Sequence, residues 1–318
     1  MSMALDVQTT IPIVDGTKIT REEFYKKYYN PQKPVVLRGL WKPYPAYTKW
    51  TMDFFKQSMG NIEVGLFGNR KEDLSRTLQV PNETMRFDEY LNLIERQPTD
   101  LRLFLFPVFK HKPELLKDFE YPAIARRYIK IPFMFFGPPK SIVRMHQDID
   151  MSNVFLTQFH GKKRVWLFSP DQSTLLYRLP FNVHSTVDVD HPDYKEYPGL
   201  KYVKGMSTVL EHGDTLFMPS GYWHHIEYIT GGFGLSVRTL ANTMPVRLKG
   251  IWYIAILRNI DNLMRKLNEK KWFQYKKKIA NSRAEKAIKK CKETHGIKQS
   301  NRLPSTKFIS SIHSFKKK

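Results

Sequence analysis

The stretch RMHQDIDMSNVFLTQFHGKKRVWLF, residues 144–168, places a histidine and an aspartate two positions apart at the start of a strand-like segment. Successive side chains of a strand point to opposite faces, so His146 and Asp148 are expected on one face, with Arg144 beside them. A neutral imidazole and a carboxylate on one face offer two adjacent ligands to a divalent metal ion. The pair therefore predicts part of a metal site, whose third ligand must come from elsewhere in the chain.

The best candidate for the third ligand lies in MPSGYWHHIEYI, where a Pro-Ser-Gly turn opens a new strand and two histidines compete for the role. In an extended segment His224 shares a face with Ile226, whereas His225 shares the other face with Glu227. Because a charged Glu227 is better placed toward solvent, we predict that His224 points inward. Two histidines and one carboxylate on one side of a metal form the facial triad of non-haem Fe(II) oxygenases.

An Fe(II) ion with open coordination sites needs a co-substrate that supplies electrons for the activation of O2. 2-Oxoglutarate does this by chelating the metal through its keto-acid end, and its far carboxylate then needs a cation. Lys163, at the start of the strand KKRVWLF, is the preferred candidate, and Arg238 in the apolar strand LSVRTL is the alternative. Asn153 and Thr157 complete the residues that we predict to bind the co-substrate.

Short alternating or apolar runs, divided by Gly and Pro, follow one another from about residue 101 and predict a barrel or jelly roll. NVFLTQFHG and KKRVWLFSP are interpreted as a hairpin across His160 and Gly161. Before this region, YTKWTMDFFKQSMG predicts one helix ending at Gly60, residues 85–97 predict an amphipathic helix, and Thr20 predicts an N-cap. Four histidines at predicted turns are expected on the surface: His160, His184, His191 and His212.

The formal net charge of +22 is concentrated at the C-terminal end. Residues 246–318 contain 21 Lys and Arg against 4 Asp and Glu, a net charge of +17, whereas the first 245 residues carry +5. Such a one-sided run is either a solvated face or a surface that attracts nucleic acid weakly. Apolar residues from Leu248 to Leu267 fall mostly on one helical face, which predicts either a dimer interface or packing on the chain's own barrel.

Length and composition limit the kinds of protein that this chain can be. With 318 residues, 41% of them hydrophobic, the chain is long enough to bury a large core. The one cysteine, Cys291, excludes an intrachain disulfide and fits a reducing compartment. The N-terminus has no signal-peptide pattern, and the apolar run at 251–257 is too short to span a bilayer. We therefore expect a cytoplasmic protein without a membrane span.

Three blocks of the chain, within roughly residues 10–242, resemble a known family: HQDIDMSNVFLTQFHGKKRVWLFSPDQ, VDVDHPDYKEYPGL and GDTLFMPSGYWHHIE. They are similar to the JmjC/cupin-like 2-oxoglutarate oxygenases, in the branch with the asparaginyl hydroxylase that restrains hypoxia-inducible factor and the tRNA wybutosine hydroxylase. The resemblance implies a double-stranded β-helix, Fe(II) at His146, Asp148 and His224, Lys163 as the partner of the co-substrate carboxylate, and a homodimer formed by the C-terminal helices. The chain departs from the family pattern at Phe104, Val154 and Arg238.

The predicted architecture is mainly β with flanking helices: an N-terminal α/β module at 1–100, a double-stranded β-helix core (jelly roll) at 101–242, C-terminal helices for dimerisation at 243–293, and a basic flexible tail at 294–318. The predicted function is an Fe(II)- and 2-oxoglutarate-dependent oxygenase that hydroxylates a C–H bond of a protein or RNA substrate. Two alternatives stay open. One is a non-catalytic metal-binding cupin module that interacts through its basic C-terminal segment, and the other is an oxygenase of small molecules.

Overall fold

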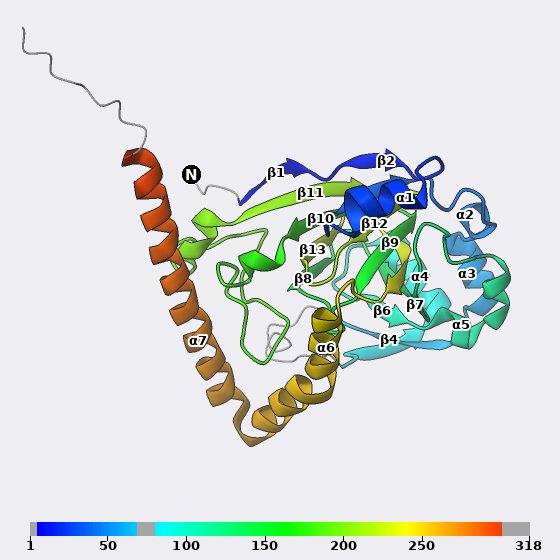
Figure 1. Ribbon diagram of the computed structural model, residues 1–318. Coiled ribbons are helices and arrows are strands. Elements are labelled where there is room, and N and C mark those ends of the chain that lie inside the picture. The colour runs from blue at the N-terminus through cyan, green and yellow to red at the C-terminus, as the bar shows by residue number, and fades with distance from the viewer. Residues whose placement is uncertain (1–4, 69–79, 301–318) are drawn as a thin grey trace, which may run out of the picture.

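The computed structural model describes residues 5–68 and 80–300, with side chains up to Glu293, and within these ranges two large β-sheets and one small sheet form the body of the protein (Figure 1). The first sheet has the strand order β2 (Ile13–Asp15), β3 (Val35–Arg38), β12 (Asp214–Met218), β9 (Asn153–His160), β14 (Gly232–Thr239), β7 (Tyr128–Gly137) and β6 (Leu103–Phe106). The second has the order β1 (Asp6–Thr10), β11 (Lys204–Leu210), β10 (Lys163–Phe168), β13 (Trp223–Tyr228) and β8 (Ile142–His146). The small sheet pairs β4 (Glu63–Leu66) with β5 (Glu83–Arg86).

From β7 onward the chain passes repeatedly between the two large sheets. Strands β7, β9, β12 and β14 belong to the first sheet, whereas β8, β10, β11 and β13 belong to the second. This is the topology of a double-stranded β-helix, in which successive strands wind around a shared interior. The predicted fold class, mainly β with flanking helices, is confirmed.

The predicted hairpin across His160 and Gly161 is wrong. Strand β9 pairs with β12 and β14, and β10 pairs with β11 and β13, so the two strands lie in different sheets. Gly161 is a corner residue with φ +74°, and a Cβ atom there would lie 2.3 Å from the carbonyl oxygen of Gly231. Both a hairpin and a corner need glycine at such a position, so the local pattern could not distinguish them.

Two apolar layers cover the central strand β9. Val154 and Leu156 face the interior between the sheets, in a cluster with Val165, Leu167 and Ile226 from the opposite sheet. Phe155 and Phe159 face outward into a second cluster, which includes residues of the N-terminal helices. Seven of the eight residues of β9 are therefore buried, and they include the polar Asn153, Thr157 and Gln158.

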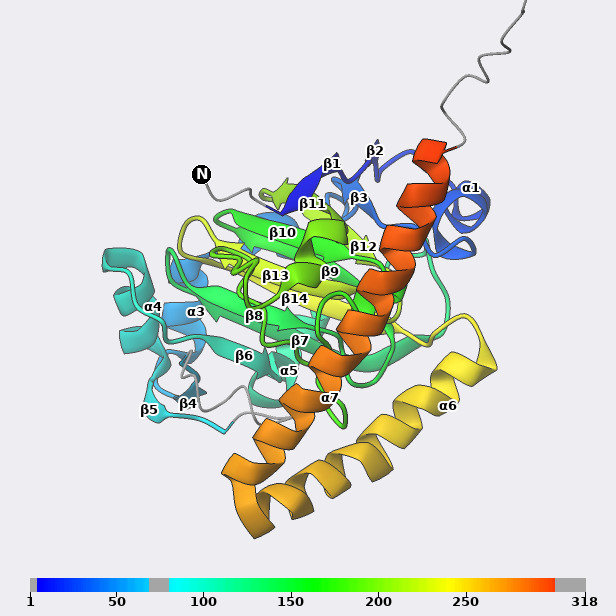
Figure 2. The same cartoon turned by 90° about the vertical axis from the view of Figure 1, so that its left-hand side faces the viewer.

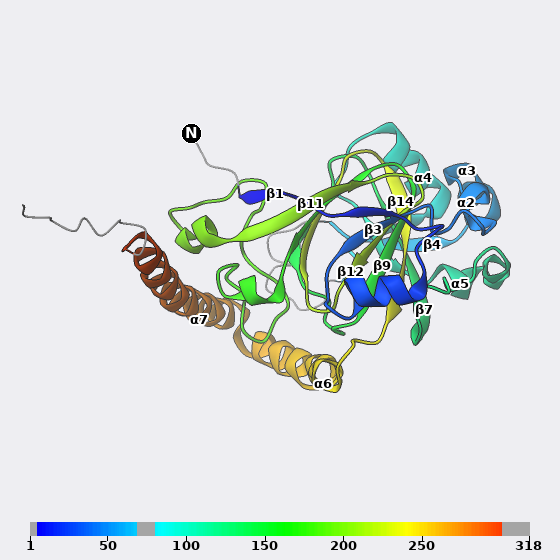
Figure 3. The same ribbon diagram turned by 45° about the horizontal axis from the view of Figure 1, so that its top comes forward.

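The N-terminal helices pack on the outer face of the first sheet (Figure 3). They are α1 (Arg21–Phe24), η1 (Tyr25–Tyr29), α2 (Ala46–Lys49), α3 (Met52–Met59), α4 (Phe87–Arg96), α5 (Val108–His111) and η3 (Pro113–Lys117). Thr20 caps α1 as predicted, because its side chain accepts a hydrogen bond from the amide of Glu23 at 3.1 Å. Two short helices, η4 (Pro170–Ser173) and η5 (Pro198–Tyr202), lie in the long connection between β10 and β11.

The single helix predicted for YTKWTMDFFKQSMG is divided in two. Trp50 is extended (φ −80°, ψ 98°) and separates α2 from α3. Its indole Nε1 donates a hydrogen bond to Asp118 at 3.0 Å, and Thr51 caps α3 by accepting from the amide of Phe54. A tertiary contact and a cap therefore outweigh the helical propensity of the segment.

The C-terminal helices form two arms beside the barrel (Figure 2). The first arm contains α6 (Met244–Trp252), η6 (Tyr253–Leu257) and the beginning of α7 (Arg258–Ser300), and it ends at a kink where Asn268 has φ −163° and ψ 92°. The second arm packs Ala280 and Ala284 on the body of the protein. Helix α7 continues into the segment predicted to be a flexible tail, whose residues 301–318 lie outside the described ranges.

Among the described residues, each helix is too short or too polar to cross a lipid bilayer.

Candidate metal centre

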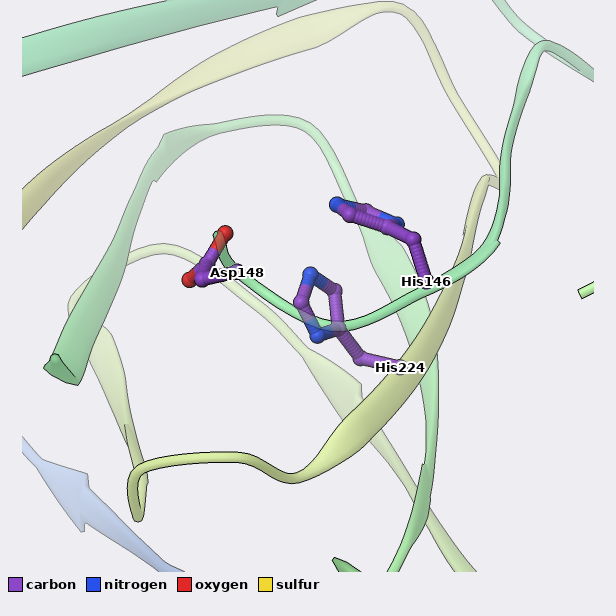
Figure 4. A group of neighbouring side chains, drawn as sticks. All are labelled: His146, Asp148 and His224. Atoms are coloured by element: carbon purple, nitrogen blue, oxygen red, sulfur yellow. The ribbon is translucent and has the colours of Figure 1, made fainter. Parts of the chain in front are cut away.

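Three predicted ligands meet in a cavity of about 200 Å³ between the two sheets. His146 ends β8, His224 lies opposite it in β13, and Asp148 follows two residues after the end of β8. One ligand atom from each side chain lies within 4.8 Å of the other two. Figure 4 shows the three side chains turned toward one another. The predicted grouping is present, but the loop after β8, rather than a strand face, carries Asp148.

Backbone contacts set the hydrogen positions on both imidazoles. The Nδ1 atom of His146 lies 2.8 Å from the carbonyl oxygen of Arg144, and that of His224 lies 3.3 Å from the carbonyl oxygen of Tyr222. Because a carbonyl oxygen only accepts, each Nδ1 carries the hydrogen and each Nε2 keeps its lone pair. Burial lowers the pKa of both histidines, so both rings are neutral and able to ligate a metal.

Asp148 is ionised. Burial by itself would raise the pKa of its carboxyl, but Arg238 and the two histidines act in the opposite direction, and the pKa is lowered overall. The Nη2 atom of Arg238 lies 3.5 Å from Asp148 Oδ1, and Nη1 lies 3.1 Å from Asp150 Oδ2. Arg238, the alternative partner for 2-oxoglutarate, thus lies at the metal end of the cavity and is already paired with two carboxylates.

Lys163 lies in the same cavity and is buried, with 1% of its surface exposed. Its Nζ atom is 4.4 Å from the ring centroid of Tyr228, and burial lowers the pKa of the ammonium to about 7. A Cβ atom on Gly234 would approach Nζ to 3.3 Å, so the glycine leaves room for the extended lysine. No carboxylate in the described part of the chain contributes to the pKa of this amine, whose shift comes from burial alone.

The hydroxyl of Ser236 is a second polar group with unused bonding capacity. It is buried, it lines the cavity, and it has no hydrogen-bond partner among the described residues. Buried polar atoms are normally hydrogen-bonded. An amine and a hydroxyl in this condition fit the carboxylate of a bound ligand.

A family model for the cupin-like domain matches residues 21–242, well over half of the chain. This chain belongs to the cupin-like JmjC family. Alignment with tRNA wybutosine-synthesizing protein 5 of Gallus gallus gives 29% identity over 258 residues, 74% of this chain and 78% of that protein. Alignment with lysine-specific demethylase 8 of Xenopus tropicalis gives 30% identity over 244 residues, 73% of this chain but 53% of the demethylase. The predicted family is confirmed.

Asn153 and Thr157, predicted to bind the co-substrate, point away from the cavity of this cupin-like domain. Asn153 donates to Leu240 O and Asn242 Oδ1, both at 3.1 Å, and accepts from the amide of Ser220. The Thr157 hydroxyl lies 2.9 Å from that of Thr215 on β12. Residues 153, 155 and 157 share the outer face of β9, because strand side chains alternate. The two polar side chains therefore tie strands and turns together.

The neighbouring histidine of the cupin-like domain, His225, has a different environment from His224. Its Nε2 lies 3.1 Å from Asp190 Oδ2, and its ring lies 5.1 Å from that of Trp166. It is buried outside the cavity, while Glu227 on the same face forms an ion pair with Arg164 near the surface. Strand alternation thus placed the two histidines as expected, although His225 is covered rather than exposed.

The prediction that His184 lies on the surface is wrong, whereas His160, His191 and His212 are exposed as predicted. His184 pairs with His146 in an isolated antiparallel bridge and lines the cavity. Sequence reasoning also missed Arg102 and Ser236, which are both buried and line the cavity. A charged residue in the apolar run LRLFLF was a usable signal for Arg102. The segment around His184 carries no comparable signal, because a loop brings it to the site.

Proposed function

We propose that this chain is an Fe(II)- and 2-oxoglutarate-dependent oxygenase that hydroxylates a C–H bond of a protein or RNA substrate and releases succinate and CO2. One observation carries the proposal. Two neutral imidazoles and one ionised carboxylate converge at a cavity that also contains the buried, unpaired amine of Lys163. A facial set of two nitrogens and one oxygen suits Fe(II) and leaves coordination positions for ligands.

His146, Asp148 and His224 would hold the iron, at which O2 would be the oxidant and 2-oxoglutarate would donate two electrons, so that one oxygen atom enters the C–H bond and the other enters succinate. The other residues of the site would orient the metal ligands and bind the co-substrate. The carbonyls of Arg144 and Tyr222 keep each Nε2 lone pair available, and Arg238 holds the Asp148 carboxylate. Lys163 and Ser236 would receive the far carboxylate of 2-oxoglutarate. Apolar side chains, among them Leu156 and Ile226, limit the access of water to this space.

Several supports favour a macromolecular substrate. One relative is named for tRNA wybutosine synthesis and another as a lysine-specific demethylase. The C-terminal segment, with net charge +17, favours a polyanionic partner, which would bind weakly through these residues.

The exposed apolar face of the first helical arm supports a homodimer. We also propose that the protein is cytoplasmic, because a single cysteine fits a reducing compartment.

The reaction is tested by measuring succinate formation from 2-oxoglutarate with purified protein, with and without Fe(II), in the presence of total tRNA or a peptide extract. We expect Fe(II)-dependent succinate formation that falls at least ~100-fold in Asp148→Ala, because removing a ligand removes the metal. Metal binding by the wild-type protein without any succinate would contradict the proposal and favour the non-catalytic interaction module.

The substrate is sought by mass spectrometry of peptides and tRNA nucleosides from cells with and without the gene. An added oxygen atom that depends on the gene, and that an Asp148→Ala copy does not restore, identifies the target. A change confined to free metabolites would contradict the macromolecular substrate and favour an oxygenase of small molecules.

A further inference from the structure

Residues 183–185 pair with residues 145–147 at the end of β8, the edge strand of the second sheet, and place His184 directly opposite a candidate metal ligand. Two hydrogen bonds fix the register: the amide of Gln147 donates to Val183 O at 2.9 Å, and the amide of Ser185 donates to Met145 O at 3.3 Å. Side chains of residues paired across antiparallel strands project from the same face. Accordingly, the rings of His146 and His184 are stacked, with centroids 5.7 Å apart and planes inclined by 21°.

The hydrogen position on His184 follows from its contact with Asn182. The Oδ1 atom of Asn182 accepts from two backbone amides, those of Val183 at 2.7 Å and of His184 at 3.2 Å. Amide N–H groups only donate, so this atom must be the oxygen of the side chain and not its nitrogen. The same oxygen lies 2.7 Å from His184 Nδ1, which therefore carries the hydrogen.

In the neutral imidazole, a hydrogen on Nδ1 leaves the Nε2 atom of His184 with an unshared electron pair. His184 lines the cavity, and no described residue donates a hydrogen bond to Nε2. The cavity thus contains one more hydrogen-bond acceptor, next to the three candidate ligands.

The C-terminal helices hold the loop of His184 in place. Arg178 donates to the hydroxyl of Tyr253 at 2.6 Å, and the ring of Phe181 lies 5.3 Å from that of Trp272. Val183 is buried in a cluster with Tyr253 and Leu257. An acceptor that is positioned by packing before a ligand arrives contributes more to specificity than a mobile one.

We propose that His184 is a substrate-positioning residue, whose Nε2 atom accepts a hydrogen bond from an N–H or O–H group beside the C–H bond that is oxidised. This role of His184 rests on the proposed function for the reaction that takes place at the metal. The presence of a hydrogen-bond acceptor at Nε2 does not depend on that function. The substrate group should then be an amide, guanidinium or hydroxyl. A fully methylated ammonium has no hydrogen to donate and would leave the buried acceptor unpaired, which disfavours its binding.

The first test determines directly which ring nitrogen of His184 carries the hydrogen. Long-range ¹H–¹⁵N NMR of metal-free protein labelled at histidine should show a neutral His184 with hydrogen on Nδ1, assigned by its absence in His184→Gln. Hydrogen on Nε2 would overturn the proposal. Because this measurement needs neither metal nor turnover, its outcome is independent of whether the protein proves to be an oxygenase.

The second test measures selectivity in protein loaded with Zn(II) and 2-oxoglutarate, which cannot turn over. Acetamide, an N–H donor, should perturb the His184 Nε2 resonance and bind roughly ten-fold more tightly than N,N-dimethylacetamide, which has no such donor. The ratio should fall toward one in His184→Phe, be partly kept in His184→Gln, and be unchanged in His191→Phe, a solvent-exposed control. Equal affinity of the wild-type protein for both probes, or no binding of acetamide, would contradict the role of His184.

Discussion

Two consecutive histidines of β13 show how one position along a strand decides a chemical role. His224 turns into the cavity with His146 and Asp148, whereas His225 turns to the opposite side and contacts Asp190. Since side chains alternate along a strand, the sequence order alone separates a candidate ligand from a structural group.

We expect His224→Ala to lose stoichiometric binding of Mn(II), with at least a ~100-fold decrease in affinity, because a direct ligand contributes more than the outer partners of metal sites. His225→Ala should retain the metal and lower the free energy of unfolding by about 1–2 kcal/mol, because its buried ring no longer packs against Trp166. Isothermal titration calorimetry and chemical denaturation measure the two effects. If His225→Ala loses the metal while His224→Ala keeps it, the assignment of the third ligand is wrong.

Lys163 predicts a dependence of co-substrate binding on pH. Burial lowers the pKa of the free amine to about 7, whereas a bound carboxylate favours the charged ammonium. Above pH 7 binding must therefore take up a proton, and the affinity for 2-oxoglutarate should fall by up to ~ten-fold per pH unit between about pH 7 and 9. Below pH 7 the amine is already charged, so this dependence should disappear.

Calorimetry in two buffers with different ionisation enthalpies measures the uptake of the proton. Lys163→Met should bind 2-oxoglutarate weakly and without proton uptake, because the methionine side chain cannot take up a proton. Arg238→Met is the matched comparison, since Arg238 is paired with Asp148 and Asp150. Near-normal, pH-dependent binding by Lys163→Met would assign the anchor to another residue.

The first helical arm shows an apolar face to solvent instead of to the barrel. Its exposed members are Met244, Leu248, Ile251, Trp252, Ile254, Ile256, Ile260, Leu263 and Leu267. Of the two interpretations of this face, packing on the chain's own barrel does not hold for these side chains. Exposed apolar patches of this extent are typical of interfaces, which favours a dimer between copies of the chain.

We expect the double variant Leu248→Asp/Ile251→Asp to be monomeric, because two charges in an apolar interface would be buried without partners. Analytical ultracentrifugation of wild-type and variant protein measures the change in mass. Leu116→Asp is the control, since Leu116 is also half-exposed but lies on η3, away from the arm. A wild-type protein that is monomeric at micromolar concentrations would refute the predicted interface.

The second arm joins the barrel firmly, which changes how its basic residues can be tested. Ala280 and Ala284 are buried against the body, and Lys276 forms a buried ion pair with Asp261 at 2.7 Å. Removing the chain after residue 268 would expose core residues and leave the Asp261 carboxylate without Lys276. Charge substitutions on the exposed side of this arm are therefore a cleaner experiment than truncation.

We expect Lys278→Glu/Lys286→Glu/Lys289→Glu to weaken tRNA binding at low salt, because these exposed lysines can release counterions from phosphates. The slope of log affinity against log salt should become less steep by about 0.7–0.9 for each phosphate that the variant no longer neutralises. Fluorescence anisotropy at several salt concentrations measures it. Lys110→Glu/Lys117→Glu/Lys195→Glu gives the same net charge elsewhere on the surface, and an equal weakening in that control would mean that the arm has no special role.

The sequence by itself determined the parts of this protein that depend on local periodicity. Strand alternation distinguished His224 from His225, and apolar runs divided by Gly and Pro indicated a barrel of short strands. The spacing of His146 and Asp148 predicted that these two side chains come together, as they do, even though β8 ends at His146. Such patterns survive because neighbouring residues share one backbone geometry, whatever the rest of the chain does.

Only the tertiary structure decided which distant groups meet. Gly161 has the same local signature at a corner as in a hairpin, so the strand pairing selected between them. The structure also placed Arg238 on Asp148, turned Thr157 away from the cavity, and brought His184 beside His146. Contacts of this kind depend on closing long stretches of chain and on the packing of both sheets, and no local pattern of residues records either.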